Sequence, residues 1–150
     1  MDLILWRHAE AEDGGPDLNR RLTATGHREA ARVAKWLRRR LPSEFTVVAS
    51  PARRARETAE ALGVTFKTVS KLAPGASVEE ILLAANWPTG KKPVVVVGHQ
   101  PDLGCAAAFL VSGERNSWTI KKGGLWWLES RERGKEAQVV VRTVIAPDLL

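Results

Sequence analysis

The fold is decided by a few short apolar stretches, and the first of them reads LILWRH, residues 3–8. Its apolar part continues without a polar break, and so do the stretches from Phe45 to Ala49 and from Val94 to Val97. Continuous runs of Leu, Ile and Val are typical of strands buried on both faces, as in a parallel sheet. We therefore expect these stretches to form a parallel sheet, with a weaker strand from Phe66 to Val69.

Helical patterns lie between these strands. After Thr23, a candidate N-cap, apolar residues recur at three- and four-residue spacing until Pro42 ends the helix. Further helices are predicted from Ala52 to Leu62, from Ser77, where a capping-box pattern begins, and from Asp102 to Val111. Strands and helices therefore alternate along the first two thirds of the chain.

The C-terminal third has a different pattern. The segments Trp118 to Lys121, Gly124 to Glu129 and Gln138 to Ile145 resemble short strands, with a turn at Gly123 and Gly124. We expect them to be antiparallel. The predicted fold class is α/β: three α/β/α layers around a mostly parallel central sheet, with antiparallel strands at the C-terminal end.

Composition excludes several classes of protein. The chain has 150 residues, of which 44% are hydrophobic and 27% are charged, close to the globular average. No apolar run approaches the roughly 20 residues that a membrane span needs. The N-terminus lacks the basic segment of a secretory signal, and the single Cys105 cannot form an internal disulfide. We expect one soluble cytosolic domain over residues 1–150, with no membrane partner.

The net charge of +6 is concentrated in one part of the chain. Between Arg20 and Arg56 there are eleven basic residues against two acidic ones, Glu29 and Glu44. Such an excess favours a negatively charged partner, which can be a nucleic acid, an anionic membrane or an acidic small substrate.

Reactive side chains follow the predicted strands directly. His8 follows the first strand, His99 follows the valine-rich strand, and the segment from Ser50 to Arg54 follows the strand between them. The carboxyl ends of parallel strands meet at one edge of a sheet, where ligands bind. A cluster of His and Arg suits a phosphoryl group, which is compact and accepts forked hydrogen bonds. A zinc site is not predicted, because no Cys, carboxylate or third His stands at ligand spacing.

These side chains also predict a reaction. A neutral His8 can attack phosphorus in line, while Arg7, Arg54 and a protonated His99 hold the other phosphoryl oxygens. Water would then hydrolyse the phosphohistidine. Because the arginines supply positive charge, we expect no metal ion and no other cofactor.

Four motifs in order resemble those of a known family. They are WRHAE at residues 6–10, DxxRxLTxxG from Asp17 to Gly26, SPxxRAxxTA from Ser50 to Ala59, and VGHQP from Val97 to Pro101. Together they resemble the histidine phosphatase superfamily, also called phosphoglycerate mutase-like. The short chain is most similar to the SixA branch, named for a phosphohistidine phosphatase.

The resemblance implies a phosphate pocket with His8 as the phosphorylated nucleophile. It implies the catalytic set Arg7, His8, Arg54 and His99, and the substrate-binding set Arg20 and Gln100.

Two departures from the family pattern bear on the reaction. Ala9 stands where the superfamily usually has Gly, and the segment from Leu72 to Ser77 lacks the Glu that longer members carry as the general acid. Without that acid, a leaving group that is a weak base is preferred. We therefore expect a phosphohistidine-bearing protein as substrate, docked with help from the basic helix between Arg28 and Arg40. The carboxylates that a loop could still bring to the leaving group are Glu10, Asp17, Glu79 and Glu80.

Other functions remain open at this point. A phosphatase of small phosphoesters would use the same residues, and a non-catalytic phosphate or phosphohistidine reader would keep the pocket without turnover. A nucleic-acid binder would use the basic segment between Arg20 and Arg56 and would show a steep salt dependence. A mutase is less well supported, because the chain has little room for insertions that enclose a substrate.

Overall fold

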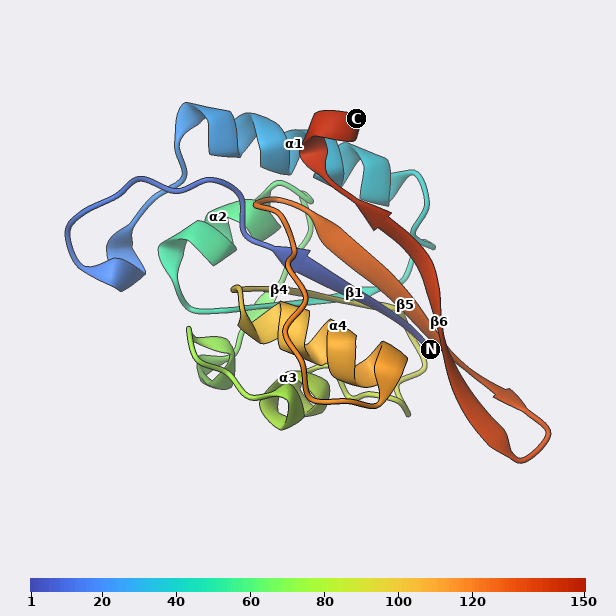
Figure 1. Cartoon of the computed structure of the whole chain (residues 1–150). Helices are drawn as coiled ribbons and strands as arrows, with labels where there is room; N and C mark the ends of the chain where they lie inside the picture. Colours follow the sequence, from blue (N-terminus) through green and yellow to red (C-terminus); the bar gives the residue numbers. More distant parts are fainter.

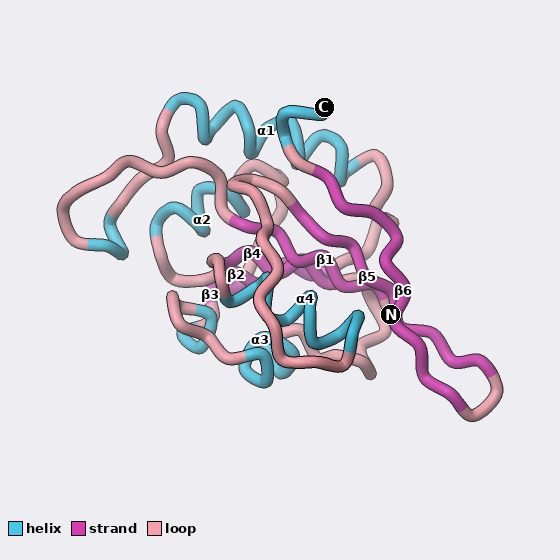
Figure 2. The backbone as a smooth tube through the Cα atoms, in the orientation of Figure 1, coloured by secondary structure: helices cyan, strands magenta, loops and turns pink.

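The computed structural model describes residues 1–150 and is built on one six-stranded sheet (Figure 2). The strand order is β3-β2-β4-β1-β5-β6. The first four strands in this order are parallel, whereas β5 is antiparallel to β1 and β6 to β5. The predicted fold class is therefore confirmed. The strands are β1 (Asp2–Arg7), β2 (Thr46–Ala49), β3 (Lys67–Thr68), β4 (Val94–Gly98), β5 (Leu125–Arg133) and β6 (Glu136–Ile145).

Helices cover both faces of the sheet (Figure 1). One hydrophobic core lies under α1 and α2, and a second lies under α3 and α4. None of the helices combines the length and apolarity that crossing a bilayer requires. The α-helices are α1 (Ala24–Arg38), α2 (Arg53–Glu60), α3 (Val78–Ala84) and α4 (Asp102–Ser112), and short 3-10 helices occupy Asp17–Asn19, Ser70–Leu72 and Pro147–Leu149.

Successive residues of β1 supply the two cores. Ile4 and Trp6 belong to the core under α1 and α2, whereas Leu3 and Leu5 belong to the core under α3 and α4. All four side chains are fully buried. A strand that contributes to two cores cannot alternate apolar and polar residues, which explains the unbroken apolar run in the sequence.

The predicted helix starts are confirmed in detail. The Thr23 side chain accepts a hydrogen bond from the Gly26 amide at 3.0 Å and caps α1. Ser77 and Glu80 form the complete capping box that begins α3. Gly26 is required for packing, since a Cβ there would lie 2.0 Å from the Glu10 carbonyl oxygen. The start of α1 therefore lies directly against the loop that follows β1.

One predicted strand is wrong. The segment from Trp118 to Lys121 is not a strand, because side chains take up its backbone carbonyls. The Trp118 carbonyl accepts from the Gln100 amide at 2.6 Å, and the Ile120 carbonyl accepts from Arg7 Nη1 at 2.7 Å. This segment therefore returns from α4 to the sheet as an extended loop beside the carboxyl end of β1.

Candidate active site

Two histidines lie side by side at the carboxyl ends of adjacent strands. Arg7 and Gly98 are paired across β1 and β4, so the next residues, His8 and His99, emerge together. Their ring centroids are 5.3 Å apart, and both residues are buried. The segment from Ser50 to Arg54 leaves the end of β2 beside them. The structure thus brings together the groups that the sequence placed after three different strands.

The hydrogen bonding of His8 fixes which ring nitrogen is free. Nδ1 lies 2.7 Å from the Ala9 carbonyl oxygen, which can only accept, so Nδ1 carries the proton. The lone pair is therefore on Nε2. Burial lowers the pKa of His8 to about 4, against the opposing effect of the Ala9 hydrogen bond, and the charge of Arg54 lowers it further. At neutral pH the free site holds His8 as a neutral nucleophile.

His99 is oriented by Ser50. Its Nε2 lies 2.7 Å from Ser50 Oγ, which also accepts the Ala52 amide hydrogen at 3.1 Å. The Ser50 hydroxyl proton is thus available for Nε2, and in this arrangement His99 Nδ1 carries a hydrogen. Burial lowers the pKa of His99 to about 3. Desolvation thus keeps His99 neutral in the free site, and its protonation when a phosphoryl group is bound stays a prediction.

Three buried N–H donors around the histidines have no acceptor. They are Arg7 Nε, Arg54 Nε and His99 Nδ1, and only one other buried side-chain atom in the chain lacks a partner. An unpartnered buried donor is costly, because it has lost water without gaining a protein acceptor. Three such donors at one place indicate a site for an anion with several oxygens.

Arg54 is the arginine of α2 that points into the site. It is 4% exposed, whereas Arg53 and Arg56 are exposed on the outer side of the helix. Arg53 pairs with Glu57 at 3.2 Å, and Arg56 donates to the Pro51 carbonyl at 3.1 Å. Arg54 is also the arginine that the family resemblance had named for the catalytic set.

Asp17 joins Arg54 to Arg20 at the mouth of the site. Its backbone oxygen and carboxylate accept from Arg54 at 2.7 and 3.2 Å, and the other carboxylate oxygen accepts from Arg20 Nε at 3.2 Å. The hydrogen bond from Arg54 is the main cause that lowers the pKa of Asp17. The Arg20 charge is also close enough to lower the pKa of His8. Asp17 is therefore the carboxylate that directly contacts both Arg54 and Arg20.

Gln100 has a different environment. Its amide nitrogen donates to the Trp118 carbonyl at 2.6 Å, and its amide oxygen accepts from the Gly104 backbone at 3.2 Å. Both ends of the side chain are therefore engaged in holding the 113–120 loop against α4. These contacts favour a structural role over the substrate-binding role that was predicted.

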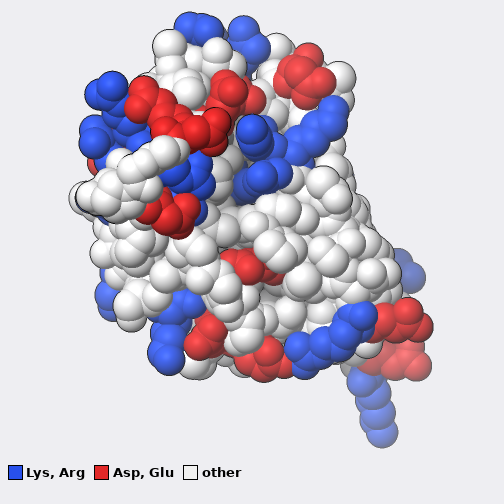
Figure 3. All heavy atoms as spheres, turned by 60° about the vertical axis from the view of Figure 1, so that its left-hand side comes forward, with Lys and Arg blue, Asp and Glu red and all other residues white.

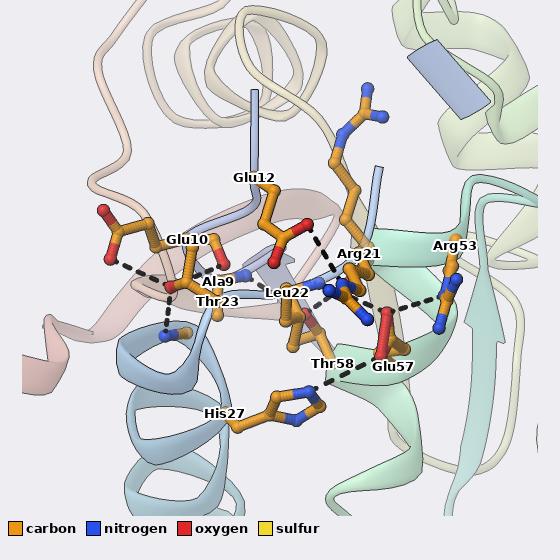
Figure 4. A network of polar contacts seen from close by, with 12 residues as sticks. Ala9, Glu10, Glu12, Arg21, Leu22, Thr23, His27, Arg53, Glu57 and Thr58 are labelled. Atoms are coloured by element: carbon orange, nitrogen blue, oxygen red, sulfur yellow. Dashed lines mark hydrogen bonds and ion pairs between the residues drawn. The ribbon is translucent and has the colours of Figure 1, made fainter. Parts of the chain in front are cut away.

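A polar network fixes the loop between β1 and α1 (Figure 4). The Ala9 amide donates to Thr58 Oγ1 at 3.0 Å, and this hydroxyl donates to the Arg54 carbonyl at 2.7 Å. The Glu57 carboxylate accepts from the Leu22 amide at 3.2 Å. The exposed His27 lies 3.5 Å from Glu57. The backbone beside His8 is thus held by the same helix that carries Arg54.

Sequence reasoning gave no role to Ser50, Thr58 or Asp102. Ser50 and Thr58 lie inside a recognised motif, and the four-residue spacing of Arg54 and Thr58 on α2 would have placed both on one buried face. Asp102 is buried, and its Oδ2 accepts from the amides of Gly75 and Ala76 at 2.9 and 3.2 Å. It fixes the segment in which the expected acid is missing, and burial raises its pKa.

The remaining candidate acids are occupied elsewhere. The Thr23 hydroxyl donates to the Glu10 carboxylate at 3.1 Å. Glu79 pairs with Arg115, and Glu80 completes the cap of α3. Neither Glu79 nor Glu80 contacts the arginines of the site.

Comparisons with known proteins agree with this site. The family model of the histidine phosphatase superfamily (branch 1) matches residues 3–76. An uncharacterised protein of Mycobacterium tuberculosis is 35% identical over 113 residues, 71% of this chain and 70% of the relative. The phosphohistidine phosphatase SixA of Escherichia coli is 30% identical over 123 residues, 76% of each chain. A SixA structure from Nakamurella multipartitia has a TM-score of 0.83 at 28% identity and covers 97% of this chain and 95% of its own.

The fold, the motifs and these relatives define one class of protein. The chain belongs to the histidine phosphatase superfamily, and within it to the SixA type. Membership of this family supports phosphatase activity.

Proposed function

We propose that the protein hydrolyses phosphoryl groups through a phosphohistidine intermediate on His8, and that its substrate is phosphohistidine on a protein. The observation that carries this proposal is the set of three unpartnered N–H donors, Arg7 Nε, Arg54 Nε and His99 Nδ1, beside a histidine with a free Nε2. A phosphoryl group supplies acceptors for all three donors and an electrophile for Nε2.

The first step transfers the phosphoryl group to the enzyme. His8 Nε2 forms a bond to phosphorus while the bond to the leaving group breaks, and the three donors hold the oxygens that carry the transferred charge. In the second step water attacks phosphorus, the bond to His8 Nε2 breaks, and inorganic phosphate leaves. Two guanidinium groups provide fixed positive charge at the reacting centre, so the proposal includes no metal ion.

The carboxylate at the mouth of the site supports phosphohistidine as substrate. The Arg54 hydrogen bond lowers the pKa of Asp17, so this carboxylate is ionised at neutral pH and has no proton to donate. A sugar phosphate releases a strongly basic alkoxide, for which a positioned acid contributes about 10²- to 10⁴-fold in rate. Imidazole is a far weaker base and departs with less assistance. The substrate of the SixA relative from Escherichia coli, as its name gives it, is of this second kind.

Trapping of the intermediate tests this proposal. Brief incubation with a ³²P-labelled phosphohistidine peptide should label the wild-type protein with a phosphate that is labile in acid and stable in base. His8→Ala should show no label, and His27→Ala, which changes an exposed histidine, should label like the wild type. Equal labelling of His8→Ala and wild type would refute the assignment of His8. Binding of the peptide without any label or released phosphate would indicate a reader instead of an enzyme.

A further inference from the structure

The outer face of α1 and its C-cap residue Arg39 carry a row of four cations. We call Arg28, Arg32, Lys35 and Arg39 the basic row; they are spaced by four, three and four residues and are all exposed. This spacing places them on one side of the helix, over a length of about 16 Å. The buried residues of α1, such as Val33 and Leu37, lie on the opposite side, so the row faces away from the core.

The basic row has no acidic partner. None of the ten ion pairs in the chain includes any of its members. The hydrogen bond that Arg28 makes is to the Thr25 hydroxyl, at 3.1 Å. Like charges at three- and four-residue spacing repel one another and destabilise a helix. Uncompensated charge of this kind favours association with a negatively charged partner.

The row begins at the edge of the candidate active site. Thr23, the cap of α1, donates to the carboxylate of Glu10, which lies two residues after His8. Figure 1 shows the start of α1 on the same side of the molecule as the carboxyl end of β1. In the view toward that side, Lys and Arg atoms lie along the upper edge, with Asp and Glu atoms beside and below them (Figure 3). A protein that placed a phosphohistidine at His8 would therefore have surface close to the first cations of the row.

We propose that the basic row is a docking surface for an acidic helix on the phosphorylated protein substrate. The inference rests on the proposed function, because the docked protein is the one that carries the phosphohistidine. The basic row places about one cation on each turn of α1. Asp and Glu residues at the same three- and four-residue spacing on a facing helix would each lie opposite one of these cations. Ala24 and Ala31 are exposed beside the row, and their small side chains allow a second helix to approach.

The same observations fit a nucleic acid less well. A helix that reads nucleic acid presents polar side chains to the bases as well as cations to the phosphates, and single strands are bound by stacking on aromatic rings. The aromatic residue of α1 is Trp36, and the Arg40 guanidinium covers its ring at 4.3 Å. The row thus offers charge in one line without a free ring for stacking.

Two matched peptides provide the test. Each is an alanine-based helical peptide of about 20 residues with one phosphohistidine near its end. One carries Glu at three- and four-residue spacing, and the other carries Gln at the same positions. At low ionic strength, wild-type kcat/KM should be about tenfold higher for the Glu peptide than for the Gln peptide. The Arg32→Glu/Lys35→Glu variant should abolish this preference and leave turnover of an aryl phosphate unchanged.

A second variant controls for net charge. Arg131→Glu/Lys135→Glu makes the same change in charge on the exposed β5–β6 hairpin and should keep the preference. An unchanged preference in the α1 variant would overturn the docking proposal, and so would an equal loss in the hairpin variant. Tighter binding of a 20-nucleotide RNA or of phosphatidylserine vesicles than of the Glu peptide, lost in the α1 variant, would assign the row to that partner instead.

Binding without turnover separates this proposal from the proposed function. The fluorescence anisotropy of a labelled, unphosphorylated Glu peptide reports docking alone. If the wild type binds this peptide but releases no phosphate from either phosphopeptide, the proposed function fails and the docking surface stands. If the wild type hydrolyses both phosphopeptides equally and does not bind the labelled peptide, the docking surface fails alone.

Discussion

The two faces of α2 use the same kind of side chain in opposite ways. On the inner face, Arg54 is almost fully buried, and its Nε has no protein acceptor. On the outer face, Arg53 is exposed and paired with Glu57 one turn away. An exposed ion pair contributes little to the free energy of unfolding. A buried N–H donor that is held in place contributes strongly to stabilising the negative charge of a bound anion. Burial, more than residue type, therefore distinguishes a reactive arginine from a surface arginine.

The largest expected effect is the difference in activity between the Arg54→Ala and Arg53→Ala variants. Arg54→Ala should lower kcat/KM by about 10²-fold or more, because it removes a preorganised charge from the phosphoryl oxygens. Arg53→Ala should change kcat/KM by less than about twofold, since its exposed pair with Glu57 is weak. Steady-state kinetics with an aryl phosphate measure both, and thermal melts establish that both variants fold. A larger loss in Arg53→Ala would reverse the comparison.

An intermediate effect is expected from pH. Burial lowers the pKa of His8 to about 4 and of His99 to about 3, from an ordinary value of 6.5. Below about pH 6.5 the unfolded chain therefore binds more protons than the folded chain, and the free energy of unfolding decreases as the pH falls. Between pH 7 and pH 5 this loss should be about 1–2 kcal/mol for each ring.

Denaturant unfolding at several pH values measures this loss. His8→Asn should make the free energy of unfolding depend less steeply on pH, because the contribution of one buried histidine is removed. If the free energy of unfolding of His8→Asn and of the wild type fell by the same amount between pH 7 and pH 5, His8 would be as well solvated as a surface residue.

The smallest expected effect concerns Asp17, the exposed carboxylate that accepts a hydrogen bond from the buried Arg54. Its carboxylate accepts from Arg54 Nη2, where under the proposed function it would compete with a phosphate oxygen. Asp17→Asn removes that competing charge, so the inhibition constant for orthophosphate should fall about threefold to tenfold, a modest change because Asp17 is more than half exposed. Inhibition of aryl phosphate hydrolysis measures it.

The same variant tests the choice of leaving group. The wild type should have a higher kcat/KM for a phosphohistidine peptide than for a sugar phosphate, and Asp17→Asn should not alter that order. Asp102→Asn is the second variant, because Asp102 is a buried carboxylate that accepts from the amides of Gly75 and Ala76, in the segment where the expected acid is missing. If either variant selectively abolished sugar phosphate turnover, that residue would be the missing acid.

Much of this architecture could be predicted because its signals are local. Unbroken apolar runs marked the strands with two buried faces, and Thr23 and Ser77 marked helix starts through their own side chains. The segment from Trp118 was misread because its carbonyls are taken by Arg7 and Gln100, which are distant in sequence.

Contacts between residues that are distant in sequence also explain which features of the site the sequence did not predict. The positions of His8, His99 and Arg54 follow from strand ends and helix spacing, so sequence reasoning could group them. The proton on His8 Nδ1 and the neutral state of His99 depend on a carbonyl, on Ser50 and on desolvation. None of these can be read from spacing alone.

The hairpin formed by β5 and β6 has a practical consequence. Its tip extends beyond the body of the molecule, as Figure 1 shows, and residues 131–138 are all exposed. Gly134 turns the chain there with a φ of 63°, and no residue of the candidate site belongs to the tip. Exposed loop tips tolerate insertions best. A fluorophore or affinity tag inserted after Gly134 would therefore report on or immobilise the protein while both the candidate active site and the outer face of α1 stay accessible.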